Sequence, residues 1–177
     1  MLTFTEPVRV LPLGYVTPAG DRDVLTIGER YGAAKYEYTV SHEFAAFLAA
    51  IDVRVVRGDL TAYEEEVLRA LHDSGIVVVC AVSEGLPVIP VTRKPLTLAE
   101  HTAAGILIQI GDADEEAIVS EIGGQLMRMI DGDRTLQDLV DELAQNDPAR
   151  RGILLEEAAA FAQSMRRTGA LTFEPVG

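Results

Sequence analysis

The sequence contains very little cysteine, which limits its covalent chemistry. Cys80 is the single cysteine among 177 residues, so no disulfide can form within the chain. It lies in the run Ile76–Val82, in which nearly every residue is branched and apolar. Such surroundings are typical of a buried, unreactive thiol and not of a nucleophile. We therefore expect a reduced, cytoplasmic protein without a cysteine-based active site.

Long hydrophobic segments are also missing. The longest apolar runs fall well short of the roughly 20 residues that a membrane-spanning helix needs. Residues 1–10 show no basic region followed by an apolar segment, so no signal peptide is expected. Apolar residues nevertheless make up 48% of the chain, which is enough to form a buried core and argues against global disorder.

Positive charge is scarce and unevenly distributed. The chain has 15 Lys and Arg residues against 28 Asp and Glu residues, a formal net charge of −13. Residues 1–95 carry 9 basic and 13 acidic groups, and residues 96–177 carry 6 basic and 15 acidic groups. A nucleic-acid-binding protein normally concentrates positive charge against phosphates. The composition therefore argues against nucleic acid and acidic membranes as partners.

The sequence shows no recognisable catalytic or metal-binding motif. His42, His72 and His101 are far apart, and none belongs to a paired-histidine metal motif. No glycine-rich phosphate loop and no nucleophile elbow is found. The acidic run 112–116 lacks the glycine and the final glutamate of a calcium loop, so a solvated hairpin tip is favoured. We expect no enzyme activity, no metal and no cofactor.

Residues 1–86 predict a small β-sheet followed by two helices and a strand. Ser41 precedes an apolar stripe with helical spacing and is a predicted N-cap. Thr61 is followed three residues later by Glu64, the pattern of a capping box. Gly75 is a predicted helix stop. The strands are expected at 8–11, 24–27, 36–40 and 76–82, with a turn at 17–21 and helices at 44–51 and 61–74.

Three prolines, Pro87, Pro90 and Pro95, predict a connector over residues 87–104. Residues 105–177 then repeat the order of the first half with one additional helix. Thr135 and Asp138 predict a second capped helix there. The strands are expected at 105–110, 116–122 and 170–173, and the helices at 123–130, 135–143 and 154–167.

The two halves are interpreted as a diverged internal repeat. Residues 47–52 correspond to residues 126–131 at an offset of 79, and residues 67–77 correspond to residues 161–171 at an offset of 94. The additional residues of the second half fall at its Thr135 helix, so the first half has lost or shortened its middle helix. The expected fold is α+β, with tandem winged-helix-like units that each pack a small antiparallel sheet on two or three helices.

The stretch from Ile106 to Phe173 resembles the PqqD-like family of RiPP recognition elements. The resemblance rests on a hairpin, Asp131-Gly132 after the first helix, Thr135-Leu136 at the start of the second, and Gly169-Ala170-Leu171 at the close. It implies a non-catalytic winged-helix domain that grips the leader of a ribosomally made precursor peptide. A separate modifying enzyme would then act on the captured precursor.

The resemblance also implies a binding site. In the family, the peptide lies between the third strand and the third helix, which correspond here to residues 116–120 and to the helix at 154–167. Small alanines would leave room for apolar anchors, Met165 would adapt to them, and Arg166 and Arg167 would pair with acidic side chains. The implied peptide-binding residues are Glu116, Ala117, Ile118, Val119, Ser120, Ala158, Ala159, Phe161, Ala162, Met165 and Arg166.

Other interpretations remain open. A stripe of Ala, Phe and Met at helical spacing is also typical of a core helix, and paired arginines near a helix end complement its dipole. A winged-helix DNA regulator would use residues 154–167 as its recognition helix, although Glu156 and Glu157 would repel phosphates. A scaffold subunit of a larger complex is the third class. The first half could form a homodimer interface or dock the enzyme.

Overall fold

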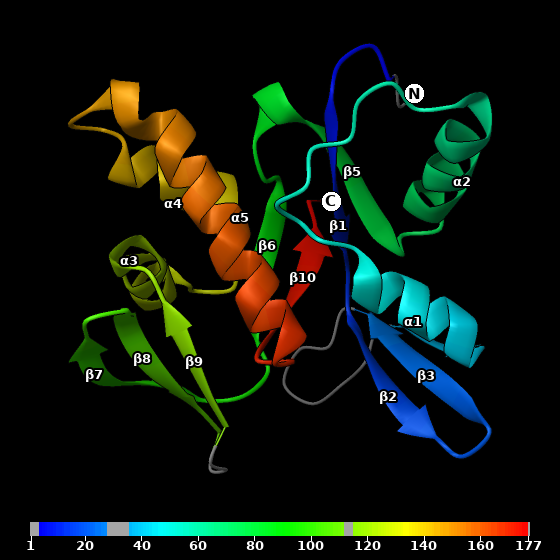
Figure 1. The fold of residues 1–177 in the computed structure, drawn as a ribbon, viewed down its shortest axis with the longest axis horizontal. Coiled ribbons are helices and arrows are strands. Elements are labelled where there is room, and N and C mark those ends of the chain that lie inside the picture. The colour runs from blue at the N-terminus through cyan, green and yellow to red at the C-terminus, as the bar shows by residue number, and fades with distance from the viewer. Residues whose placement is uncertain (1–3, 28–35, 112–114, 177) are drawn as a thin grey trace.

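The first half of the chain forms one structural unit closed by its first and last strands. In this computed structural model, which describes residues 4–27, 36–111 and 115–176, strand β1 pairs antiparallel with β5, and β2, β3 and β4 form an antiparallel sheet. Figure 1 shows this unit on the right of the molecule. Its elements are β1 (Val8–Pro12), β2 (Tyr15–Ala19), β3 (Arg22–Ile27), β4 (Tyr36–Val40), α1 (His42–Ala50), α2 (Ala62–Asp73), β5 (Val77–Ala81) and the 3₁₀ turn η1 (Val82–Glu84).

The second half repeats this arrangement with an additional helix. Strand β6 pairs with the last strand, β10, and β7, β8 and β9 form a three-stranded antiparallel sheet. The α+β class expected from the sequence is therefore confirmed. The elements are β6 (Val88–Thr92), β7 (Leu96–Thr102), β8 (Gly105–Ile110), β9 (Glu115–Val119), α3 (Glu121–Met129), α4 (Leu136–Leu143), the 3₁₀ turn η2 (Pro148–Arg150), α5 (Arg151–Arg167) and β10 (Leu171–Pro175).

The internal repeat extends to strand register and helix ends. The β1–β5 ladder runs from the pair Val8–Ala81 to Pro12–Val77, and the β6–β10 ladder runs from Val88–Pro175 to Thr92–Leu171. Helices α1 and α3 have equal length, and each begins at a serine N-cap and ends at an isoleucine with extended backbone. Helices α2 and α5 both end at a glycine with positive φ, which only glycine adopts without strain. The two halves therefore share the same strand pairing and the same kinds of helix ends.

The halves differ in what fills the space between their outer helices. In the second half, α4 packs against both α3 and α5, and its Leu136, Leu139 and Val140 are fully buried. In the first half, residues 51–61 run from α1 to α2 without any regular helix. The middle helix is therefore absent from the first half, as the offset between the two sequence repeats predicted.

Several local predictions are confirmed. Ser41 accepts a hydrogen bond from the Phe44 N–H at 3.2 Å. Thr61 and Thr135 each form a capping box, with Glu64 and Asp138 respectively. These contacts form within three residues of the cap, so the local sequence was sufficient to predict them.

The predicted connector over residues 87–104 is wrong as a description of structure. It contains β6 and β7, which pair with strands of the second half. Among the described strands β6 pairs with β10 alone, and such an edge strand tolerates a residue without an N–H, which accommodates Pro90. The expected turn at 17–21 lies mostly within β2.

The strand expected at 116–122 is shorter than predicted. It ends at Val119, and Ser120 already caps α3 by accepting from the Gly123 N–H at 3.1 Å. Gly123 and Gly124 let α3 approach closely, since a Cβ on Gly124 would lie 2.4 Å from the Ile106 side chain. The acidic hairpin tip at 112–114 lies outside the described residues.

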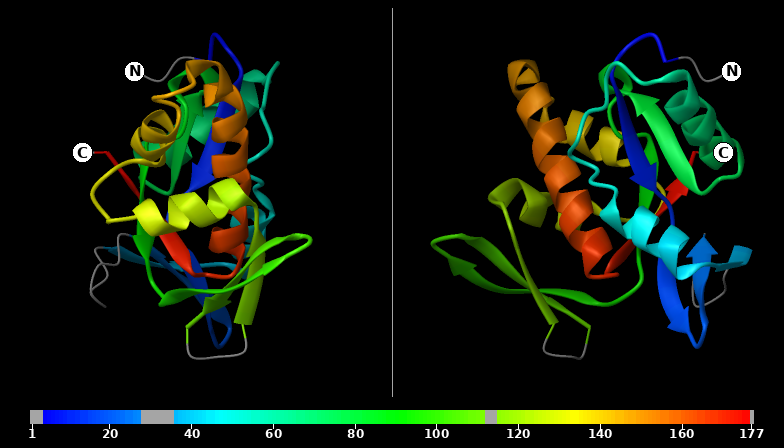
Figure 2. Two further views of the ribbon diagram at one scale, coloured as in Figure 1. Left: turned by 90° about the vertical axis from the view of Figure 1, so that its left-hand side faces the viewer. Right: turned by 45° about the vertical axis from the view of Figure 1, so that its right-hand side comes forward.

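Helix α5 occupies the centre of the molecule. Figure 2 shows it between the second-half helices and the segment at 51–61 of the first half. Much of it is buried, from Leu154 to Met165. No helix within the described part of the chain is long and apolar enough to cross a membrane.

Candidate functional site

Strand β9 is the edge of its sheet. It pairs with β8 on one side, and no described strand lies on its other side. The side chains of Ala117 and Val119 are buried, whereas Glu116 and Ile118 face solvent. Ile118 is 52% exposed, so an accessible apolar side chain lies next to the open backbone groups of this edge.

A small groove lies between this edge and helix α5. Its volume is about 110 Å³, and it combines one apolar wall, small side chains and one carboxylate. Strand β9 and helix α5 also pack directly against each other, so the groove lies along a contact between these two elements. Its lining residues are Ile118, Val119, Ser120, Glu157, Ala160, Phe161 and Ser164.

Most of the helix residues predicted for peptide contact lie elsewhere. Ala158, Ala159, Ala162 and Met165 are fully buried in the core, so their side chains are not accessible to a ligand. The prediction was wrong here because α5 is covered by both halves of the molecule and not by one sheet alone. Phe161 is also buried but contributes to the groove wall.

Sequence reasoning missed the row of α5 that does face the groove. Glu157, Ala160 and Ser164 are partly exposed and are spaced three and four residues apart, so they lie on one face of the helix. In the sequence, these three residues form a row of small or polar side chains next to the apolar stripe of the helix. Only the packing of both halves on α5 shows which row remains open.

Arg166 was predicted to contact the peptide, but it turns toward the first half. Its guanidinium donates to the backbone carbonyls of Leu48, at 3.2 Å, and of Ile51. Burial and then the like charge of Arg167 lower the pKa of Arg166 below its ordinary value. It therefore helps to hold the end of α1 against α5.

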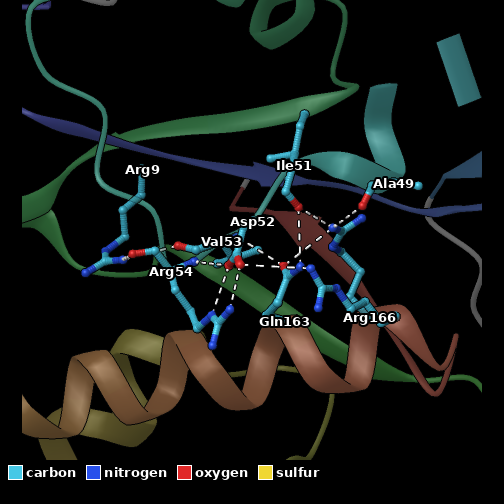
Figure 3. A network of polar contacts seen from close by, with 9 residues as sticks. Arg9, Ala49, Ile51, Asp52, Val53, Arg54, Gln163 and Arg166 are labelled. Carbon is cyan, nitrogen blue, oxygen red and sulfur yellow. Dashed lines mark hydrogen bonds and ion pairs between the residues drawn. The ribbon is translucent and has the colours of Figure 1, made fainter. Parts of the chain in front are cut away.

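Gln163 joins the halves at a buried position beside Arg166, as Figure 3 shows. Its Oε1 accepts from the Val53 N–H at 3.0 Å, and its Nε2 donates to the Ile51 carbonyl at 3.4 Å. Each buried backbone group that lacked such a partner would destabilise the fold. Gln163 thus supplies hydrogen bonds to a segment that has no helix of its own.

Arg9 makes a second connection from strand β1. Its buried guanidinium donates to the carbonyls of Val53, at 3.1 Å, and Arg54, at 2.9 Å, and forms an ion pair with Glu156 of α5. Glu156, which would have opposed phosphate binding in a recognition helix, is thereby part of the contact between the halves.

Equivalent aspartates follow α1 and α3. The Arg54 side chain lowers the pKa of Asp52 from 3.8 to about 2, mainly through a hydrogen bond. Hydrogen bonds from the backbone of Asp133 and Arg134, and then from the Arg134 side chain, lower the pKa of Asp131. Both carboxylates stabilise turns, and neither belongs to the groove.

The potential catalytic side chains remain dispersed. The His42 Nδ1 lies 2.6 Å from an Asp23 oxygen, and the His72 Nδ1 accepts from the Val79 N–H at 3.2 Å. Cys80 is buried, and desolvation raises its pKa to about 12. Within the described residues, no three His, Cys, Asp or Glu side chains cluster where they could hold a metal ion.

Two of the larger hollows away from the groove lie within the first half and between the halves. One of about 280 Å³ separates α1 from α2, next to Phe47 and Tyr63, where the first half has no middle helix. The other, of about 490 Å³, lies between the two halves.

Comparison of the chain with protein-family models, with curated proteins and with solved structures gave no match.

Proposed function

We propose that the protein is a non-catalytic binding protein that captures the leader of a ribosomally made precursor peptide and presents it to a separate modifying enzyme. The single observation that carries the proposal is the groove between the open edge of β9 and helix α5. This is the place at which the PqqD-like resemblance expects a peptide.

Strand addition explains how such a groove would bind. The outward N–H and C=O groups of β9 can form a ladder with an extended peptide, which supplies affinity that depends little on sequence. Alternate side chains of the peptide would then face the groove, where Ile118 of β9 and Phe161 of α5 offer apolar contact. Ala160 and Ser164 leave space for these side chains because they are small.

The groove also suggests the charge of the peptide. Glu157 is the one charged residue among its described lining residues, while Arg166 is directed elsewhere. We therefore expect a Lys or Arg in the bound segment opposite Glu157, and not the acidic residues that paired arginines would have selected.

The geometry gives less support to the alternative function, a winged-helix DNA-binding regulator. Its recognition helix would be α5, which is largely buried and tied to β1 through Glu156. The proposal further includes the cytoplasm as the compartment, since ribosomal precursors are made there. The role of the first half as an enzyme dock or homodimer interface stays a prediction.

The test is a selection of random peptides displayed on phage against the full chain. Selected peptides are then measured by fluorescence polarisation against wild type, Ile118→Thr and Ser164→Phe. The first variant removes apolar contact and the second fills the groove, so each should weaken binding at least about tenfold. Ile153→Thr, at a 61% exposed position outside the groove, is the matched control and should bind normally.

Hydrogen exchange adds a readout of strand addition. Bound peptide should slow amide exchange within 115–119, because new ladder hydrogen bonds protect the edge. The proposal fails if no peptide is selected, or if the selected peptides bind both groove variants as tightly as wild type.

A further inference from the structure

The first half of the molecule leaves an apolar hollow open where the second half has a helix. This hollow of about 280 Å³ lies between α1 and α2, and most of its described lining residues are apolar or aromatic. Phe47 of α1 and Tyr63 of α2 border it and are 43% and 74% exposed. Figure 1 shows α2 at the outer edge of the molecule, away from the helices of the second half. The border of the hollow is therefore accessible from solvent.

Exposed apolar side chains are concentrated in this region. Nine large apolar side chains are exposed in the described part of the chain, and four of them fall within residues 47–63. Two of the four border the hollow, and the other two, Val55 and Val56, lie on the segment that joins α1 to α2. Apolar side chains that gather in one exposed region are typical of a contact with another protein.

The second half shows what fills the equivalent place. There α4 packs against both α3 and α5, which are the counterparts of α1 and α2. The apolar stripe of α4 has the spacing i, i+3, i+4 and i+7, and it consists of Leu136, Leu139, Val140 and Leu143. Because the two halves share their strand pairing and helix ends, the place between α1 and α2 suits an amphipathic helix of the same kind.

The charges around the two places differ in sign. In the second half, Arg134 and Arg151 form ion pairs with carboxylates of α4. In the first half, Glu64 and Arg57 line the apolar hollow, and Arg57 also lines an adjoining hollow of about 260 Å³. The adjoining hollow adds three acidic residues, which are Glu6, Asp59 and Glu65. The acidic residues therefore outnumber the basic one along this surface, and they complement a helix with basic residues.

We propose that the hollow between α1 and α2 binds one amphipathic helix of a partner protein, with apolar residues at i, i+3, i+4 and i+7 and Lys or Arg beside them. The apolar residues enter the hollow, and the basic residues pair with the acidic rim. A second copy of the chain is a poorer occupant, because its own α4 is acidic and buried and each copy carries a net charge of −13. The site does not depend on peptide capture at the β9 groove.

The experiment is a selection of displayed helical peptides of about 15 residues, cross-linked because short helices are marginal in water, against the full chain. The library fixes apolar residues at the spacing of the α4 stripe and varies the flanking positions among Lys, Glu, Gln and Ala. We expect peptides with Lys beside the stripe to be enriched over peptides with Glu. Enriched peptides are then titrated by fluorescence polarisation. Tyr63→Ala should weaken their binding at least about tenfold, because it removes a large apolar contact at an exposed position.

The charge of the rim is tested at Glu64. Glu64→Gln keeps the capping box of α2 and should weaken binding about two- to fivefold. The matched control is Glu66→Gln, at an exposed position of the same helix outside both hollows, and it should bind like wild type. Ser164→Phe, which fills the β9 groove, should also bind the helix like wild type, so failure at one site is distinguishable from failure at the other.

The proposal is overturned if no helical peptide is enriched, if acidic helices are enriched instead, or if Tyr63→Ala binds the selected helices as tightly as wild type. Sedimentation of the full chain tests a second copy as the occupant. We expect Tyr63→Ala to leave the sedimentation coefficient unchanged. A dimer that this variant dissociates would place a second copy in the hollow and would also overturn the proposal.

Discussion

The two halves of the molecule keep the same order and register of strands but bury different amounts of their helices. In the second half, α4 packs on α3 and α5, and Leu126 of α3 is 0% exposed. The equivalent residue of α1 is Phe47, which is 43% exposed next to a hollow. A diverged repeat can therefore keep its backbone plan while one lost helix changes a core position into a surface position.

The two halves also differ in which strands their last helix packs against. Helix α5 packs against both β10 and β9, which creates the groove. Its counterpart α2 packs against β5, and Figure 1 shows α1 between α2 and the strands β2 and β3. Among the described residues, the packing of the third helix on the edge strand that borders this groove is seen in the second half.

The largest expected effect tests the difference in burial. Leu126→Ala should lower the free energy of unfolding by about 2–5 kcal/mol, because it creates a cavity in a packed core. Phe47→Ala removes a larger side chain but should cost about 1 kcal/mol or less, since much of Phe47 already contacts water. Urea denaturation of both variants measures the difference. Equal losses would mean that the first half is covered as well as the second.

A second prediction concerns the junction that compensates for the missing helix. Gln163→Leu should cost about 1–3 kcal/mol, because it leaves the buried Val53 N–H without its partner, while the Ile51 carbonyl keeps its hydrogen bond from Arg166. Gln125→Leu, at an exposed position of α3, should change stability by about 0.5 kcal/mol or less. If the two substitutions cost the same in urea denaturation, the segment at 51–54 does not depend on α5.

The smallest expected effect is a pH dependence at Asp52. Its folded-state pKa of about 2 lies below its ordinary 3.8, so the ionised form stabilises the fold above about pH 4. That contribution is lost as the pH falls from about 4 to about 2. Asp52→Asn should therefore cost roughly 1–2 kcal/mol at pH 7, after allowance for solvent screening of the pair, and less at lower pH.

Chemical denaturation at pH 7, 4 and 2.5 follows this change. Asp147→Asn, at an exposed position, is the control for the loss of one carboxylate and should change stability at pH 7 by about 0.5 kcal/mol or less. A constant difference between Asp52→Asn and wild type across the three pH values would contradict the proposed role of the ionised carboxylate.

Some parts of the candidate site could be predicted from the sequence. Residues 116–119 lie on the edge strand, and Phe161 borders the groove. The alanines and Met165 could not be assigned correctly, because their small or apolar character suits both a ligand site and a core. Arg166 was misassigned because its carbonyl partners lie more than a hundred residues away in the sequence.

By itself, the sequence determined the helix caps, the glycine stops, the buried strand around Cys80 and the repeat. These features depend on contacts within a few residues or on a pattern that can be compared along the chain. Only the tertiary structure decided that the proline-rich stretch contains β6 and β7, and that Glu157, Ala160 and Ser164 face an open groove. Strand pairing and burial depend on partners that are distant in the sequence, and local patterns carry no information about which partner is chosen.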